Sequence, residues 1–155
     1  SDNDGGSRRG AGEVRFRDVS IVTDDGNRTL FAETGEDLRI RMEFEVTEKV
    51  ESLKFGVSFR HDAGQLISLT TTEADGLPIG AVSEAGTVEF VVPDLPLFNG
   101  QYLLSFYAVT ESGDKVYDEI ERAIKLTVRG TLPRGKEGIV ELGGSGTMTA
   151  GGREA

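Results

Sequence analysis

The sequence contains no cysteine and no tryptophan, only one histidine, and only 4 prolines among 155 residues. Without cysteine, the chain cannot form a disulfide, a thiolate metal site or a cysteine nucleophile. The single histidine, His61, lies in a predicted turn beside Asp62, and no G-x-S-x-G serine motif or Walker motif is present. These absences argue against catalysis, and we expect no enzymatic activity and no cofactor.

Positive charge is also scarce, since 17 basic residues stand against 27 acidic ones, for a formal net charge of −10. Such a surface repels phosphate backbones, so we expect no nucleic-acid partner. No apolar run approaches the length of a membrane span, and residues 1–12 lack the apolar region of a signal peptide.

Carboxylates suggest two other functions, a glycosidase and a calcium site. Glu43 and Glu45 could act as a glycosidase pair, although neighbouring charges on the solvent face of a strand are more typical of solubilising residues. The acidic turns at Asp24–Asp25 and Asp114–Asp118 could hold a structural calcium ion, yet neither has the spacing of a known calcium loop. We therefore predict no metal site and leave calcium open.

The length fits one domain with an ordinary core. Residues 1–12 and 143–155 are polar and glycine-rich, which predicts a flexible linker, a domain over residues 13–142 and a flexible tail.

Within these limits the apolar residues recur with a period of two, most clearly in "LRIRMEFEV" (38–46). This pattern is typical of a half-buried antiparallel strand. Only "VYDEIERAI" (116–124) has a four-residue spacing that would allow a helix. About eight short strands separated by turns indicate an all-β fold, a jelly-roll β-sandwich of two antiparallel sheets. We expect its core to contain Phe16, Ile40, Phe44, Phe55, Val57, Phe59, Phe90, Tyr102, Leu104 and Phe106.

The opposite faces of these strands carry groups suited to sugar binding. Alternation places five polar or aromatic side chains there: Arg39, Arg41, Ser58, Arg60 and Tyr107. An aromatic ring can stack on the C–H face of a sugar, and arginines donate to hydroxyls. An ordinary solvent face is the competing interpretation. If the strands share one sheet, Arg41, Arg60 and Tyr107 would form a shallow groove.

Four motifs in order resemble the C-terminal domain of Wzt-type proteins, the nucleotide-binding subunits of bacterial ABC transporters that export O-antigen polysaccharide. They are "SRRGAGEVRFRDVSIVTDDG", "FAETGEDLRIRMEFEV", "FGVSFRHDAGQLISLTTT" and "VEFVVPDLPLFNGQYLLSFYAV", and they span about residues 8–142. The chain departs from the family pattern at Arg9, where an aromatic is common, and at its end, which lacks a tryptophan that some members carry.

The resemblance implies a non-catalytic carbohydrate-binding module that recognises the O-antigen polysaccharide on the cytoplasmic side of the inner membrane. It also implies an ATPase domain and a membrane subunit as partners, and a homodimer in which the C-terminal strand, "GIVEL" (138–142), is swapped. The alternative is a structural or adhesion-type sandwich that mediates protein–protein contacts.

Overall fold

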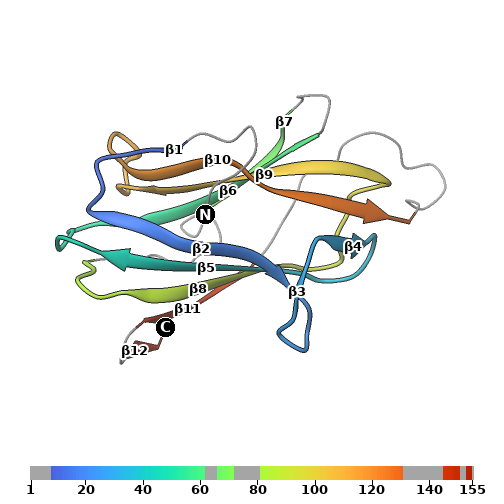
Figure 1. Cartoon of the computed structure of the whole chain (residues 1–155), viewed down its shortest axis with the longest axis horizontal. Helices are drawn as coiled ribbons and strands as arrows, with labels where there is room; N and C mark the ends of the chain where they lie inside the picture. Colours follow the sequence, from blue (N-terminus) through green and yellow to red (C-terminus); the bar gives the residue numbers. More distant parts are fainter. Residues whose placement is uncertain (1–7, 62–65, 72–80, 131–144, 151–152, 155) are drawn as a thin grey trace.

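The computed structural model describes residues 8–61, 66–71, 81–130, 145–150 and 153–154. Its described residues form strands, turns and bends without a helix, and the strands are arranged in two layers (Figure 1). We call these layers sheet A and sheet B.

Sheet A has the order β1–β10–β9–β6–β7, with β4 also paired to β10. Its strands are β1 (Arg8–Arg9), β4 (Phe31–Glu33), β6 (Lys54–His61), β7 (Leu66–Thr71), β9 (Gly100–Val109) and β10 (Val116–Arg129). All of its pairings are antiparallel except that of β4 with β10.

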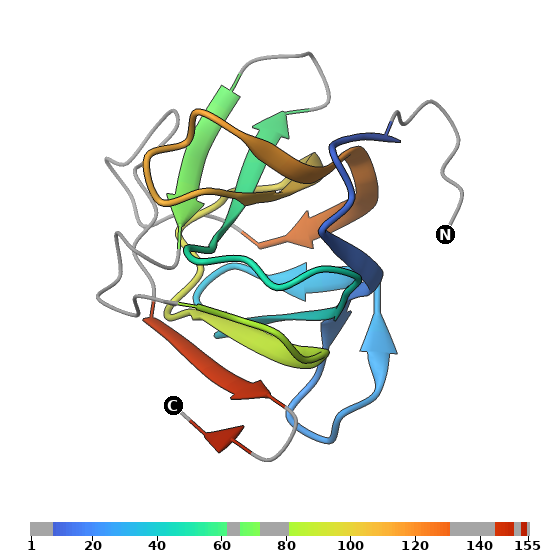
Figure 2. The same ribbon diagram turned by 90° about the vertical axis from the view of Figure 1, so that its left-hand side faces the viewer.

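Sheet B has the order β12–β11–β8–β5–β2–β3, and its pairings are all antiparallel. Its strands are β2 (Val14–Val22), β3 (Arg28–Thr29), β5 (Leu38–Val46), β8 (Gly86–Val92), β11 (Ser145–Ala150) and β12 (Arg153–Glu154). Figure 2 shows the two sheets stacked face to face. The predicted all-β sandwich is confirmed.

The core lies between the sheets, where the inward residues of each strand interdigitate. All ten residues predicted for it are at most 3% exposed. Three aromatic pairs join sheet B to sheet A: Phe16 with Phe55, Phe16 with Phe106, and Phe44 with Phe55, at ring-centroid distances of 5.7, 6.2 and 5.1 Å. Burial of these rings supplies much of the free energy of folding.

The helix-like spacing in residues 116–124 belongs to β10, whose pairing with β9 shifts register twice, between Val116 and Asp118 and between Ile120 and Ile124. Ile120 pairs with Phe106 and Ile124 with Leu104, so four positions along β10 match two along β9, as at a bulge. The strand pattern is interrupted there, and the consecutive residues Tyr117 to Ile120 are all buried.

Two segments assigned to flexible ends contain strands. Arg8–Arg9 form β1, and beyond Gly10 the backbone N–H groups of Ala11 and Gly12 donate hydrogen bonds to the carbonyls of Val116 and Tyr117. In the predicted tail, Ser145–Ala150 form β11, which pairs with β8. The segment 138–142, predicted to be exchanged between protomers, lies outside the described residues.

Candidate functional site

The structure divides the five predicted sugar-binding residues between the two sheets. Ser58 and Arg60 lie on β6 and Tyr107 lies on the adjacent β9, so these three share the outer face of sheet A. Arg39 and Arg41 lie on β5, on the outer face of sheet B. The single groove expected from Arg41, Arg60 and Tyr107 is therefore not formed, because the core separates the two faces.

On sheet A, Tyr107 and Ser58 form a hydroxyl pair. The Tyr107 hydroxyl lies 3.2 Å from Ser58 Oγ, and either oxygen can donate. Tyr107 is half-buried, and its register partner on β6 is Gly56, which has no side chain. A ring beside a strand glycine covers backbone that would otherwise be open to solvent. The hydroxyl bond holds this ring in place on the face.

A row of side chains continues from Tyr107 toward the sheet edge. Register pairs Tyr107 of β9 with Glu119 of β10, and Glu119 with Arg9 of β1. Glu119 is only 5% exposed, and its Oε1 lies 2.7 Å from an Arg9 guanidinium nitrogen. We call the outer-face set Arg9, Glu119, Tyr107, Ser58 and Arg60 the sheet A face.

Burial raises the pKa of Glu119, and Arg9 opposes this shift by favouring the carboxylate, while Glu121 adds to it. Glu119 and Arg9 were missed in the sequence because the bulges of β10 disguise its strand pattern and Arg9 lies in a segment that reads as a linker. The distribution of charged residues along the sequence did not indicate either residue.

Arg39 and Arg41 of sheet B are both engaged by Glu89. Arg41 donates two hydrogen bonds to Glu89 Oε2, at 3.1 and 2.9 Å, and Arg39 donates one to Glu89 Oε1 at 3.3 Å. Arg39 also reaches Asp24 at 3.4 Å. Carboxylates already neutralise the charge of these two guanidinium groups. The two arginines therefore attract an acidic substituent of a sugar less strongly than unpaired arginines would.

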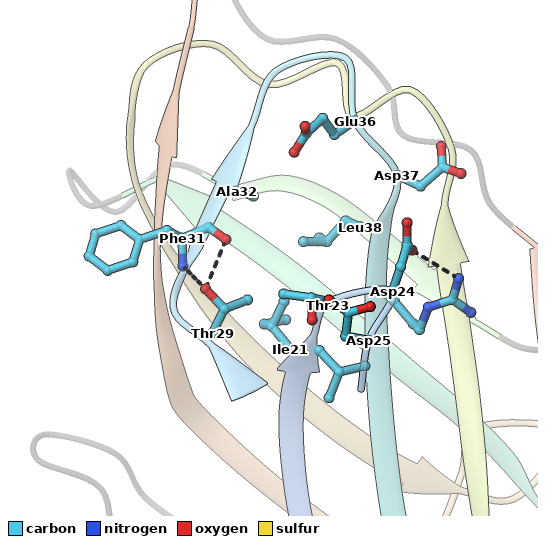
Figure 3. Close-up of a pocket in the computed structure, with 12 residues that line it drawn as sticks. Ile21, Thr23, Asp24, Asp25, Thr29, Phe31, Ala32, Glu36, Asp37 and Leu38 are labelled. Atoms are coloured by element: carbon cyan, nitrogen blue, oxygen red, sulfur yellow. Dashed lines mark hydrogen bonds and ion pairs between the residues drawn. The ribbon is translucent and has the colours of Figure 1, made fainter. Parts of the chain in front are cut away.

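Arg39 also lines a pocket of about 440 Å³ at one end of the sandwich, between the β2–β3 loop and the β4–β5 turn. Figure 3 shows Leu38 and Ile21 within it, acidic side chains around it, and the Phe31 ring pointing away. The carboxylates are those of Asp24, Asp25, Glu36 and Asp37. Such a pocket can accept hydrogen bonds from hydroxyl or amino groups, and it disfavours anions.

Beside this pocket lie the two exposed large hydrophobic residues of the described chain, Leu30 (56% exposed) and Phe31 (58%). The Arg129 guanidinium lies 5.6 Å from the centre of the Phe31 ring. A second depression, of about 650 Å³, lies between Leu30, Phe31 and the β10 residue Ile124. An exposed apolar pair of this kind is suited to contact with another protein.

Metal binding finds no support in the described part of the chain, where no group of three or more acidic or histidine side chains is placed to hold an ion. Asp118, assigned above to an acidic turn, is a buried residue of β10. The described residues also include no helix with the length and apolarity needed to span a membrane.

Comparison with known proteins identifies the family. The model of the Wzt C-terminal domain family matches residues 6–142. The chain is similar to the crystal structure of the C-terminal domain of Wzt, with a TM-score of 0.77 and 18% sequence identity over 90% of this chain and 86% of that chain. At this low sequence identity, the structural similarity supports the fold and nothing beyond it.

A second solved structure, a Niemann-Pick type C2 protein from the Japanese carpenter ant, matches with a TM-score of 0.49 and 10% identity over 79% of this chain and 98% of that chain, which is too distant to bear on function. No curated protein gives a significant match. The family match spans most of the sequence and agrees with the fold, and the chain thus belongs to the Wzt C-terminal domain family.

Proposed function

We propose that this chain is a non-catalytic carbohydrate-binding module that recognises an O-antigen polysaccharide for export by an ABC transporter. Membership of the Wzt C-terminal domain family implies a role in such a transporter, and this family is a transporter component rather than a catalytic one. In the whole protein, the module would act beside the ATPase domain and the membrane subunit, at the cytoplasmic face of the inner membrane.

The observation that carries the proposal is the placement of Tyr107. Its ring faces outward from sheet A, half-buried and fixed by the hydroxyl bond to Ser58. A fixed aromatic ring loses little conformational entropy when a sugar stacks on it, and its remaining apolar surface is removed from water. Arg60, exposed on the same face, adds donors for sugar hydroxyls.

The test is calorimetric titration of the full chain with O-antigen polysaccharide purified from the bacterium that encodes it, with dextran as the control glycan. We expect saturable binding to the O-antigen only, weakened at least severalfold by Tyr107→Ala and by Arg60→Ala. Phe31→Ala is the matched control, because it removes an exposed aromatic ring at the pocket end, away from the sheet A face. Absence of binding by the wild-type chain would refute the proposal, and cleavage of the polysaccharide would refute its non-catalytic part.

The second candidate is a structural or adhesion-type module that only mediates protein contacts. The exposed pair Leu30 and Phe31 favours it, since two large apolar side chains at one sandwich end provide a contact surface without any sugar. The same titration separates the two candidates. A contact module would bind no polysaccharide, and its partner binding would be lost in Phe31→Ala rather than in Tyr107→Ala.

A further inference from the structure

We infer that Arg9, on the N-terminal strand β1, contacts the polysaccharide together with Tyr107, and that binding is thereby linked to the docking of β1 on β10. This inference rests on the proposed function. It adds a ligand-binding residue in a segment that reads as a linker, and it makes an edge strand of sheet A responsive to occupancy of the sheet A face.

The first step is the placement of Arg9. Arg9, Glu119 and Tyr107 are successive register partners across three neighbouring strands. Partner side chains on one face of a sheet lie about 5 Å apart, so the row is short enough for one oligosaccharide to cover. The Arg9 side chain is 68% exposed, whereas that of Glu119 is 7% exposed. Arg9 is thus the accessible charged group of the row.

The second step concerns the donors of Arg9. Its guanidinium nitrogen lies 2.7 Å from Glu119 Oε1, so Arg9 and Glu119 form an ion pair. A guanidinium has five N–H donors, and those of Arg9 that do not face Glu119 can donate to sugar hydroxyls or ring oxygens. Glu119 is a positioning residue that holds Arg9 over the sheet.

The third step is that the position of Arg9 depends on the docking of β1. The backbone N–H groups of Ala11 and Gly12 donate to the carbonyls of Val116 and Tyr117, at 3.0 and 2.9 Å. Gly10 has a φ of +146°, and a Cβ there would lie 2.2 Å from the Tyr117 carbonyl oxygen. Only glycine allows this close approach.

Linkage follows from these contacts. A ligand that touches Arg9 only when β1 is docked binds the docked state more tightly than the undocked one. It therefore shifts the equilibrium toward docking. Conversely, a substitution that undocks β1 must lower the affinity for the ligand, because part of the binding free energy is then used to restore docking.

The experiment compares polysaccharide affinity and amide hydrogen exchange in the full chain, with the O-antigen polysaccharide used above as the probe. We expect the polysaccharide to slow exchange at Ala11 and Gly12. We expect Arg9→Ala to weaken binding at least severalfold, with Arg9→Lys intermediate because lysine keeps the charge but not the planar fork. Arg28→Ala, which removes an exposed ion pair of sheet B with Asp18, is the matched control and should leave the affinity unchanged.

Two further variants separate the roles. Gly10→Ala should undock β1 and weaken binding about as much as Arg9→Ala while the circular dichroism of the folded sandwich persists. Glu119→Gln should weaken binding in the wild-type background and have no further effect in the Arg9→Ala background, because its contribution acts through Arg9. A residue needed only for folding would lower affinity in both backgrounds.

The outcomes distinguish this inference from the proposed function. If the wild-type chain binds and Tyr107→Ala weakens binding, but Arg9→Ala binds as tightly as wild type, the sheet A face stands and the inference falls. Unchanged exchange at Ala11 and Gly12 on binding would also overturn it. If the wild-type chain binds no polysaccharide, the proposed function fails first.

Discussion

Asp118 of β10 accepts a hydrogen bond of 2.8 Å from the backbone N–H of Phe16 on β2, so a single buried carboxylate joins sheet A to sheet B. The same carboxylate receives two hydrogen bonds from Arg8, at 3.1 and 2.7 Å, and Arg8 in turn donates to the Phe16 carbonyl. Phe16 sits where the pairing of β2 with β5 shifts register, which leaves its N–H free of the ladder. Asp118 thus satisfies a buried donor that the bulge creates.

The first prediction follows from that contact. Asp118→Ala leaves the Phe16 N–H and the Arg8 guanidinium without their acceptor, and we expect it to lower the free energy of unfolding by about 3 kcal/mol. Chemical denaturation measures this loss. Asp18→Ala is the control, because it breaks a more exposed ion pair, with Arg28, and should cost less than about 1 kcal/mol. Equal losses in the two variants would contradict the role of Asp118.

The second prediction concerns the neighbouring carboxylate, Glu119. Burial raises its folded-state pKa above the ordinary value of 4.5, so the folded chain holds this proton at a pH where the unfolded chain has released it. The contribution of Glu119 to the free energy of unfolding is therefore fully present below about pH 4.5, and it is lost as the pH rises through the folded-state pKa. The facing groups are Arg9 of β1, Glu121 of β10 and the Tyr107 side chain of β9.

Glu119→Gln removes this titration. The unfolding free energy of the variant minus that of the wild type should accordingly rise as the pH increases from about 4.5 to 7. The difference is the quantity to measure, because other groups, such as Glu13 with its lowered pKa, titrate equally in both proteins. A difference that falls over this range would show that Arg9, not burial, dominates at Glu119.

The sequence predicted the sandwich well because alternation of apolar residues reports directly on burial. The strands β5 and β9, which have an unbroken period of two, were identified with their correct inner faces. The Tyr107 ring was placed outward by the same argument. A pattern with period two needs no knowledge of the neighbouring strands.

What the sequence did not reveal depends on partners far along the chain. Strand order decides that Arg41 and Tyr107 lie on opposite sides of the core, and no local pattern encodes it. The bulges of β10 are visible only from its register with β9, so Asp118 and Glu119 read as surface acids. Arg9 joins the sheet through pairing with residues more than a hundred positions away.

The third prediction uses this separation of the faces. If the polysaccharide binds the sheet A face, Arg41→Ala should leave affinity within about twofold of the wild type, although the sequence alone placed Arg41 in the predicted groove. Arg41 is held by Glu89 on sheet B, so a contribution from Arg39 and Arg41 would require a second, separate glycan contact. Titration of Arg41→Ala beside Tyr107→Ala decides between the faces, and a loss in Arg41→Ala alone would place the ligand on sheet B.

The fourth prediction is a homodimer. The edge of β8 pairs with β11 of the same chain at six register positions, so this edge can hold a C-terminal strand. Because an identical strand from a second chain would make the same hydrogen bonds, exchange costs little. We expect light scattering at tens of micromolar to show a dimer, and removal of residues 137–155 to yield a monomer. A dimer that survives this truncation would rule out exchange of the C-terminal strand.

The last prediction separates the ring of Tyr107 from its hydroxyl. Tyr107→Phe keeps the stacking surface but removes the bond to Ser58, so it should cost about 1 kcal/mol of stability and retain most of the polysaccharide affinity. Tyr107→Ala removes both, and because the ring is half-buried we expect a stability loss of about 2 kcal/mol, larger than for a typical surface site. Ser58→Ala completes the set. In a double-mutant cycle with Tyr107→Phe, its stability effect should be less than additive, since both variants delete the same bond. If Tyr107→Phe binds as poorly as Tyr107→Ala, the hydroxyl and not the ring contacts the sugar, and the stacking argument fails.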